Sequence, residues 1–289
     1  MQMKLCKTWL FMMVAGLCLC LVPGTAPAAD RAQVLKQGAE KLKALFGESE
    51  GKALMQNVDL FKQAGLSYQP SLVLPVEGLI GCKDKEQLRI LLGMYAFDAN
   101  YALLFGKKQE FGAANTLVVK SIPERLNMGG KLKFKTFTQD EIKKIADNPN
   151  DPANRDLYIK YVIANFHDLF QTAESDQEIM AMMVDALYGS IVQCLYVSSR
   201  LALAAGTGEK LVDLFNDQAK RLDKFQQVLE AYAGDPELAG LVERPERQPV
   251  IRPVFELLKA KKGNLSEAYV KKILSSIEPE RNKVVEKCD

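Results

Sequence analysis

Two long apolar stretches decide the fold: LRILLGMYAFDANYALLF, residues 88–105, and IMAMMVDALYGSIVQCLYVSSRLALAA, residues 179–205. Both are longer than an ordinary strand and contain few charged residues. Wound as helices, they are apolar on nearly every face, and such helices belong in the core of a protein. The two stretches therefore predict an all-α fold with two buried central helices.

The rest of the chain shows helix start signals between apolar-periodic segments. Thr138–Glu141 and Ser175–Glu178 each place a capping side chain three residues before a glutamate, and Asp151 precedes a proline at a first helical position. Pro123 is expected to kink or interrupt its helix. The predicted helices span residues 30–46, 50–64, 84–105, 107–128, 139–147, 152–173, 176–205, 208–233, 236–242, 253–262 and 266–286.

The short connections between these helices favour antiparallel neighbours. We therefore expect a multi-helix bundle or a stack of antiparallel helical hairpins, forming a single domain over residues 29–289. A proline-rich stretch at residues 244–253 marks a candidate sub-boundary.

The first twenty-eight residues have the pattern of a secretory signal peptide. Lys4 and Lys7 precede the apolar run Trp9–Val22, and Ala26–Ala28 places small residues at the two positions that a signal peptidase reads. The run is shorter than the roughly 20 residues of a bilayer span. We expect cleavage before Ala29 and a mature protein that is periplasmic or secreted, with no transmembrane span.

Removing this segment lowers the formal net charge from +2 to about 0, because the segment carries two lysines and no acid. A neutral, evenly mixed charge gives no electrostatic reason to expect nucleic-acid binding. Three cysteines then remain. Cys194 lies in an apolar helix pattern and is expected to be a buried small hydrophobe. Cys82 and Cys288 are candidates for a disulfide in an oxidising compartment, although sequence does not supply the geometry.

Each apolar helix carries one aspartate with a tyrosine three residues later, on the same face: Asp98 with Tyr101, and Asp185 with Tyr188. A buried carboxylate needs a hydrogen-bond donor, a cation or a ligand. The default interpretation is a polar clamp that holds the core helices in register; the alternative is a ligand pocket formed by these four residues. The recurring Asp-Ala-x-Tyr sequence hints at two related halves. The candidate counter-charges are Arg89, Lys120, Arg125 and Arg200.

The chain lacks the motifs of common catalytic and metal centres. His167 is the only histidine, and Asp168 beside it does not share its helix face. His-Glu-x-x-His and Cys-x-x-Cys-His are absent, and the one Gly-x-Ser-x-Gly match, Gly47–Gly51, lies between two predicted helices rather than at the strand-to-helix turn of a nucleophile elbow. Gly206–Lys210 lacks the spacing of a phosphate-binding loop. The sequence therefore predicts no catalytic constellation, no metal site and no cofactor.

The segment Gly93–Gln109, which begins Gly-x-Tyr-x-x-Asp-x-x-Tyr, resembles a pattern in uncharacterised all-helical secreted proteins and lipoproteins of bacteria. Ala173–Glu178 leading to Leu187–Tyr196 is similar to a second block of that family, and Ile273–Val285 resembles its last helix. The resemblance implies an all-helical exported protein and brings no activity or ligand. This chain departs from the lipoproteins because leucine, rather than a small residue, precedes both signal-segment cysteines that could be lipidated.

These observations lead us to expect an exported, non-enzymatic helical protein that binds a ligand or a periplasmic protein partner. Aromatic residues of the apolar helices could line a groove for an apolar ligand, although core packing is their default role. These residues are Tyr95, Phe97, Tyr101, Phe105, Tyr188 and Tyr196. One alternative is an enzyme that uses the two Asp–Tyr pairs as acid/base groups, which requires a carboxylate with a raised pKa and a path to solvent. The other is a structural envelope module, which requires internally satisfied aspartates and no cavity.

Overall fold

The computed structural model describes residues 28–45, 61, 65–79, 81–132, 134–204, 206, 212–232, 250, 252–254, 256–257 and 266–286. Within these ranges the regular elements are helices and none is a strand, which confirms the predicted all-α class. The expected signal peptide and Cys288 lie outside the described residues. So do, in whole or in large part, the expected helices at 50–64, 236–242 and 253–262 and the candidate sub-boundary at 244–253.

The α-helices are α2 (Ala28–Leu45), α4 (Lys85–Leu104), α5 (Lys108–Thr116), α6 (Ile122–Arg125), α7 (Gln139–Asp147), α8 (Pro152–Ala173), α9 (Gln177–Ala204), α10 (Val212–Tyr232) and α13 (Glu267–Glu286). Two short 3-10 helices, η1 (Pro70–Leu72) and η2 (Val76–Leu79), precede α4, and a π-helix, η3 (Leu117–Ser121), joins α5 to α6.

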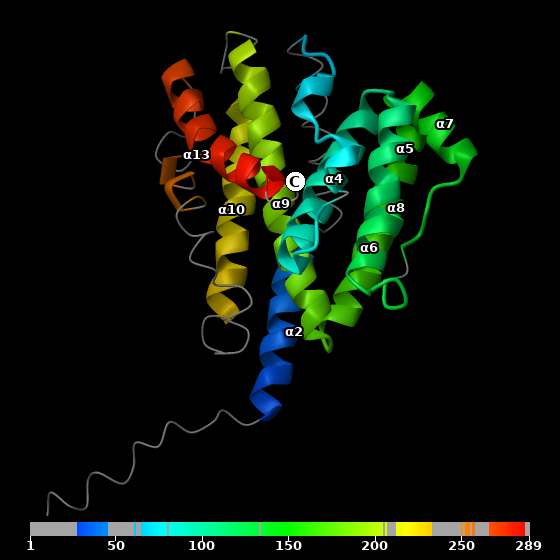
Figure 1. Ribbon diagram of the computed structural model, residues 1–289, viewed down its shortest axis with the longest axis vertical. Coiled ribbons are helices and arrows are strands. Elements are labelled where there is room, and N and C mark those ends of the chain that lie inside the picture. The colour runs from blue at the N-terminus through cyan, green and yellow to red at the C-terminus, as the bar shows by residue number, and fades with distance from the viewer. Residues whose placement is uncertain are drawn as a thin grey trace, which may run out of the picture.

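The two apolar stretches become α4 and α9, which pack against each other at the centre of the molecule (Figure 1). The segment from α5 to α8 covers one side of this pair, and α10 and α13 cover the other. Helix α2 contacts both α10 and α8. The predicted arrangement of buried central helices inside a helical shell is thus present.

Two glycines let the central helices touch backbone to backbone. A Cβ atom on Gly93 would lie 1.7 Å from the carbonyl oxygen of Ala186, and one on Gly189 would lie 2.0 Å from that of Ile90. Any larger residue at either position would collide with the opposing main chain. The crossing point of α4 and α9 is therefore fixed by these two residues.

Helix α9 is the one helix in the described part of the chain that is long and apolar enough to cross a membrane. In this fold, 89% of its most apolar window is buried against other helices. Such burial is typical of a central core helix, and it explains why this helix is apolar on every face.

The helix starts follow the predicted caps in two cases and differ in one. Thr138 forms the full capping box of α7, and Asp151 accepts hydrogen bonds from two backbone N–H groups of α8. At α9, Asp176 rather than Ser175 accepts from the second and third helical N–H groups. The aspartate directly precedes Gln177, the first helical residue, so its carboxylate reaches these groups first.

The helix interruption expected at Pro123 takes the form of a π-helical turn. The backbone N–H of Ile122 bonds to the carbonyl of Leu117, five residues earlier. Proline has no N–H to continue the ordinary ladder, and the chain accommodates one extra residue in the turn that precedes it. The predicted helix at 107–128 is therefore divided into α5, η3 and α6.

Candidate functional site

The first predicted pair contains Asp98, which is only 3% exposed and joins α4 to two other segments. Its Oδ2 accepts a hydrogen bond from the backbone N–H of Leu74 at 2.8 Å, and its Oδ1 accepts from Nε2 of Gln193 at 2.7 Å. Nε of Arg281 in turn donates to Oε1 of Gln193 at 2.8 Å. Burial raises the pKa of Asp98 to about 7, although both hydrogen bonds and the Arg281 charge act in the opposite direction.

Tyr101 binds the same loop from one turn further along α4. Its hydroxyl accepts from the backbone N–H of Gln69 at 3.2 Å and donates to the carbonyl of Ser67 at 3.5 Å. Its ring packs against Tyr68 with centroids 4.9 Å apart. Burial raises the pKa of Tyr101 to about 12, so its hydroxyl stays protonated near neutral pH. Together with Asp98, it holds the segment before α4 against that helix.

The second predicted pair joins α9 to two of its neighbours, α4 and α13. Asp185 is fully buried, and its Oδ2 accepts from Nε of Arg89 on α4 at 2.7 Å. The hydroxyl of Tyr188 donates to Oε1 of Glu280 on α13 at 2.9 Å. Arg89 was one of the expected counter-charges, and the structure places it as the partner of Asp185.

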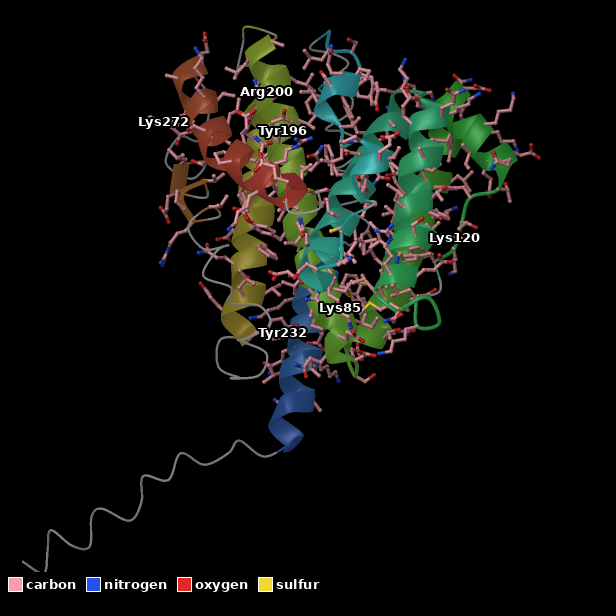
Figure 2. The ribbon with its side chains drawn as sticks, in the orientation of Figure 1. Lys85, Lys120, Tyr196, Arg200, Tyr232 and Lys272 are labelled. Atoms are coloured by element: carbon pink, nitrogen blue, oxygen red, sulfur yellow. The ribbon has the colours of Figure 1, made fainter. Side chains whose placement is uncertain are left out.

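The other expected counter-charges contact neither aspartate. Arg125 donates to the backbone carbonyls of Leu79 and Cys82. Arg200 pairs with Glu278, and Figure 2 shows it close to Tyr196. Lys120 is exposed and lies at the outer edge of the molecule in the same view.

The four predicted residues therefore form two separate polar clamps, which is the default interpretation of the sequence. Along α4, the Arg89–Asp185 bond lies before Gly93 and the Asp98–Gln193 bond lies after it, so the two clamps occupy opposite sides of the helix crossing. The recurring Asp-Ala-x-Tyr sequence thus does not mark equivalent positions in two halves. None of the four side chains lines the cleft described next.

The two cysteines in the described residues, Cys82 and Cys194, agree with the expectations of a disulfide candidate and a buried thiol. Cys82 is buried and disulfide-bonded, and Cys194 is a buried thiol of α9. The side chain of Gln87 donates to the carbonyl of Val284, which brings the last turn of α13 beside the first turn of α4. Cys288 lies outside the described residues, so its pairing with Cys82 stays a prediction.

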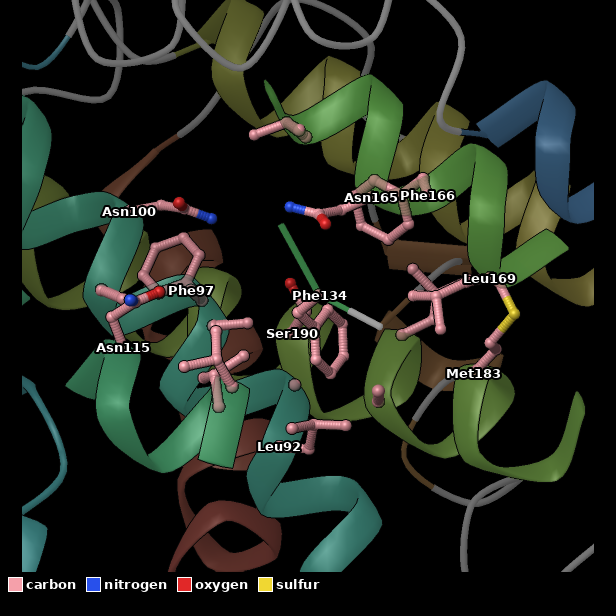
Figure 3. A pocket seen from close by; sticks show the side chains of 18 of the residues that line it. Leu92, Phe97, Asn100, Asn115, Phe134, Asn165, Phe166, Leu169, Met183 and Ser190 are labelled. Carbon is pink, nitrogen blue, oxygen red and sulfur yellow. The ribbon is translucent and has the colours of Figure 1, made fainter. Parts of the chain in front are cut away.

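An apolar cleft of about 220 Å³ lies between α4, the α5–η3 segment, α8 and α9 (Figure 3). Each of the four walls contributes residues at helical spacing, so that one stripe of each helix faces the space. The stripes are Gly93, Ala96, Phe97 and Asn100 on α4; Asn115, Val118 and Val119 on α5 and η3; Val162, Asn165, Phe166 and Leu169 on α8; and Met182, Met183, Ala186, Leu187 and Ser190 on α9.

Two features of the sequence create this space. The stripes of α4 and α9 include the small residues Ala96, Ala186 and Ser190, so at these positions the two helices send little side-chain volume into the gap beside their crossing. The π-helical turn directs two consecutive residues, Val118 and Val119, to the same wall, and such turns occur often at functional sites.

A short segment between α6 and α7 completes the cleft, and hydrogen bonds to α8 hold it in place. Asn165 accepts from the backbone N–H of Lys135 at 2.7 Å and donates to its carbonyl at 3.2 Å. The hydroxyl of Tyr161 donates to the same carbonyl, and its ring stacks on Phe137 with centroids 3.5 Å apart. These contacts place Phe134 inside the cleft (Figure 3).

The polar groups in the cleft are neutral. None of the described residues that line it is charged, and the side chains of Asn100, Asn115 and Ser190 make no hydrogen bond to another described residue. Figure 3 shows the side-chain amides of Asn100 and Asn165 directed towards one another across the cleft. The site thus combines an apolar surface with amide and hydroxyl groups that can donate or accept a hydrogen bond.

Metal chemistry finds no support in the described part of the chain, where no three His, Cys, Asp or Glu side chains gather closely enough to hold an ion. His167 is exposed on α8, with Nδ1 3.9 Å from Oδ1 of Asp168. Comparison of this chain with protein-family models, curated proteins and solved structures finds no match. The resemblance to helical secreted proteins therefore stays a prediction, and the geometry of the cleft carries the argument on function.

Sequence reasoning did not find this cleft. Of its lining, only Phe97 belongs to the aromatic residues for which a groove was considered. The available signal was the stripe of small residues that includes Ala96, Ala186 and Ser190 within helices that are otherwise built from large apolar residues.

Proposed function

We propose that this protein is an exported, non-enzymatic binding protein for a small apolar molecule, held in the cleft between α4, α5, α8 and α9. The observation that carries the proposal is an apolar space bordered by Asn100, Asn115 and Ser190, neutral polar residues whose side chains make no hydrogen bond within the described part of the chain. Ligand sites typically combine an apolar lining with a few convergent polar groups in this way. The volume of about 220 Å³ lies below the roughly 300–1,000 Å³ of most such sites, so the ligand is small.

The catalytic alternative is less well supported. The raised pKa of Asp98 is a property that acid/base groups share. Its carboxyl, however, is 3% exposed and bonds to Leu74 and Gln193, away from the cleft. Asp185 is fully buried in its ion pair with Arg89. A purely structural module fits the satisfied aspartates but leaves the cleft without a role.

Export rests on the signal-peptide pattern of residues 1–28. Expression of the full chain in a bacterium, followed by fractionation and intact-mass measurement, tests it. We expect a periplasmic or secreted protein that begins at Ala29. A full-length chain in the cytoplasm would contradict this part of the proposal.

The binding function is tested by isothermal titration calorimetry with 1-octanol, a small neutral apolar probe. Ala96 lines the cleft on α4, and the Ala96→Phe variant fills the space with a ring. Ala113 is exposed on α5 and does not line the cleft, so Ala113→Phe is the matched control. We expect saturable binding to the wild-type protein and to Ala113→Phe, and loss of binding in Ala96→Phe.

Equal binding by all three proteins would place the probe elsewhere, and no binding by the wild-type protein would contradict the proposed function. Native mass spectrometry of protein purified from its own compartment adds an independent observation. An adduct that disappears on denaturation and is absent from Ala96→Phe would supply the mass of the physiological ligand.

A further inference from the structure

The chemistry of the cleft narrows the class of ligand, provided that the proposed binding function holds. We infer that the ligand is a single short aliphatic chain with a neutral, hydrogen-bonding headgroup (an amide, an ester or a hydroxyl), and that Asn100 and Asn115 bind this headgroup. Three observations lead to this assignment: the absence of charge among the described lining residues, two amides that make no hydrogen bond to a described residue, and the size of the space.

The absence of charge disfavours a free carboxylate or an ammonium as headgroup. None of the lining side chains in the described part of the chain is charged. The described cations beside the lining on the α8 side are exposed: Lys160 precedes the lining residue Tyr161, and Lys135, whose Nζ lies 3.6 Å from Oδ2 of Asp168, follows Phe134. Lys120 follows a lining residue but is exposed at the outer edge of the molecule. An ionised headgroup would therefore lose hydration in the cleft without gaining a counter-charge from the described lining.

The asparagines differ in what they are free to bind. Asn165 uses both its oxygen and its nitrogen on the backbone of Lys135, so it serves to position the wall of the cleft. Asn100 on α4 and Asn115 on the adjacent α5 have no such partners, and both line the cleft while remaining half-buried. Each amide offers a donor and an acceptor, which together match a carbonyl or a hydroxyl group.

The size of the space limits the length of the chain. At about 30 Å³ for each water-sized group, 220 Å³ holds roughly seven such groups. Each methylene that enters an apolar site from water strengthens binding about fourfold. Affinity should therefore rise about fourfold per carbon and level off once the chain has about seven or eight carbons.

The test is isothermal titration calorimetry of the mature protein with octanamide and octanoate, which share a chain length and differ in headgroup charge, at about pH 8, where the acid is ionised. We expect octanamide to bind at least about tenfold more tightly than octanoate. Straight-chain amides of about four to twelve carbons should give the fourfold steps and the plateau.

The headgroup assignment is tested with the double variant Asn100→Leu, Asn115→Leu, which removes the amides and keeps a similar volume. We expect its affinity for octanamide to fall about tenfold, because two hydrogen bonds are lost. Asn282→Leu, on an exposed position of α13, should bind octanamide like the wild-type protein. Circular dichroism establishes that each variant is folded, and the comparison of amide with acid in the wild-type protein needs no variant.

The outcomes separate this inference from the proposed function. If octanoate binds as tightly as octanamide, or if affinity keeps rising beyond about ten carbons, the ligand class is wrong while the cleft remains a binding site. If the double variant keeps its affinity for octanamide, the headgroup lies elsewhere. If octanol, octanamide and octanoate all fail to bind the wild-type protein, the proposed function itself fails.

Discussion

Replacement of Asp185 by asparagine separates a structural role of this residue from a ligand-binding role. The carboxylate is completely buried, and its Oδ2 lies 2.7 Å from Nε of Arg89, whose side chain is only 9% exposed. Asp185→Asn keeps the shape of the side chain but removes the negative charge. The guanidinium of Arg89 then remains inside the fold without a charged partner, which is costly in a poorly solvated environment.

The expected loss of stability follows from this burial. Removing one partner of a buried ion pair typically costs about 3–5 kcal/mol in the free energy of unfolding. Replacing both partners by apolar residues of similar size, Arg89→Met with Asp185→Leu, removes the buried charges together. The double variant should therefore lie within about 1–2 kcal/mol of the wild-type protein, much closer than either single variant.

The assay is urea unfolding followed by far-ultraviolet circular dichroism, carried out for the wild-type protein, both single variants and the double variant. Glu267→Gln provides a control, because Glu267 and Lys271 form an exposed ion pair on α13 whose loss should be barely detectable. Octanol affinity measured on the same proteins should stay unchanged, since neither Asp185 nor Arg89 lines the cleft.

Two results would refute this reasoning. A loss of less than about 1 kcal/mol in Asp185→Asn would mean that the ion pair does not stabilise the core as its burial implies. Intact stability combined with a large loss of octanol affinity would mean that Asp185 serves a ligand after all.

Three further predictions test other parts of the structure. Gly93→Ala should lower the free energy of unfolding by about 3 kcal/mol or more, because its methyl group would meet the opposing backbone. Gly112→Ala, where the added methyl group has nothing within 4 Å, should raise it by about 0.5–1 kcal/mol, and urea unfolding measures both changes. Asp98 stays protonated in the folded protein up to about pH 7 but ionises near pH 4 in the unfolded chain. Its contribution to the free energy of unfolding is therefore full below about pH 4 and falls by on the order of 4 kcal/mol as the pH rises to about 7. Between about pH 4 and about pH 7, the free energy of unfolding should depend less on pH in Asp98→Asn than in the wild-type protein. Equal pH dependence in the two proteins would contradict the raised pKa. Peptide mass mapping without reduction should recover Cys82 linked to Cys288, and recovery of Cys82 with another partner would reject this pairing.

The helices themselves could be predicted because their signals are local. The bounds predicted for α7 and α8, 139–147 and 152–173, are those of the structure. The capping box at Thr138 and the cap at Asp151 define these starts within a few residues of the chain. The position at which the 107–128 segment divides was harder to predict, because the π-helical turn depends both on Pro123 and on the packing around it.

The candidate site was predictable only in part. Burial of Asp98 and Asp185 in apolar helices implied that each needs a partner, and Arg89 was correctly among the candidates. The contacts of Gln193 and Arg281 were missed, because these residues are far away in sequence and meet only when α4, α9 and α13 pack. Their amide and guanidinium groups carry no pattern that indicates a partner in advance.

The sequence by itself determined the all-α class, the two central helices and the need to satisfy two buried carboxylates, because hydrophobic periodicity, capping and the cost of burying charge act over short stretches of chain. The tertiary structure decided where helices cross and where space is left. The contact at Gly93 and Gly189 brings two backbones together. The small side chains beside this contact, and the π-helical turn η3 that forms part of the opposite wall, leave an apolar cleft. Such a cleft is a property of four helices at once, since the volume that each stripe leaves unfilled depends on the helix that faces it.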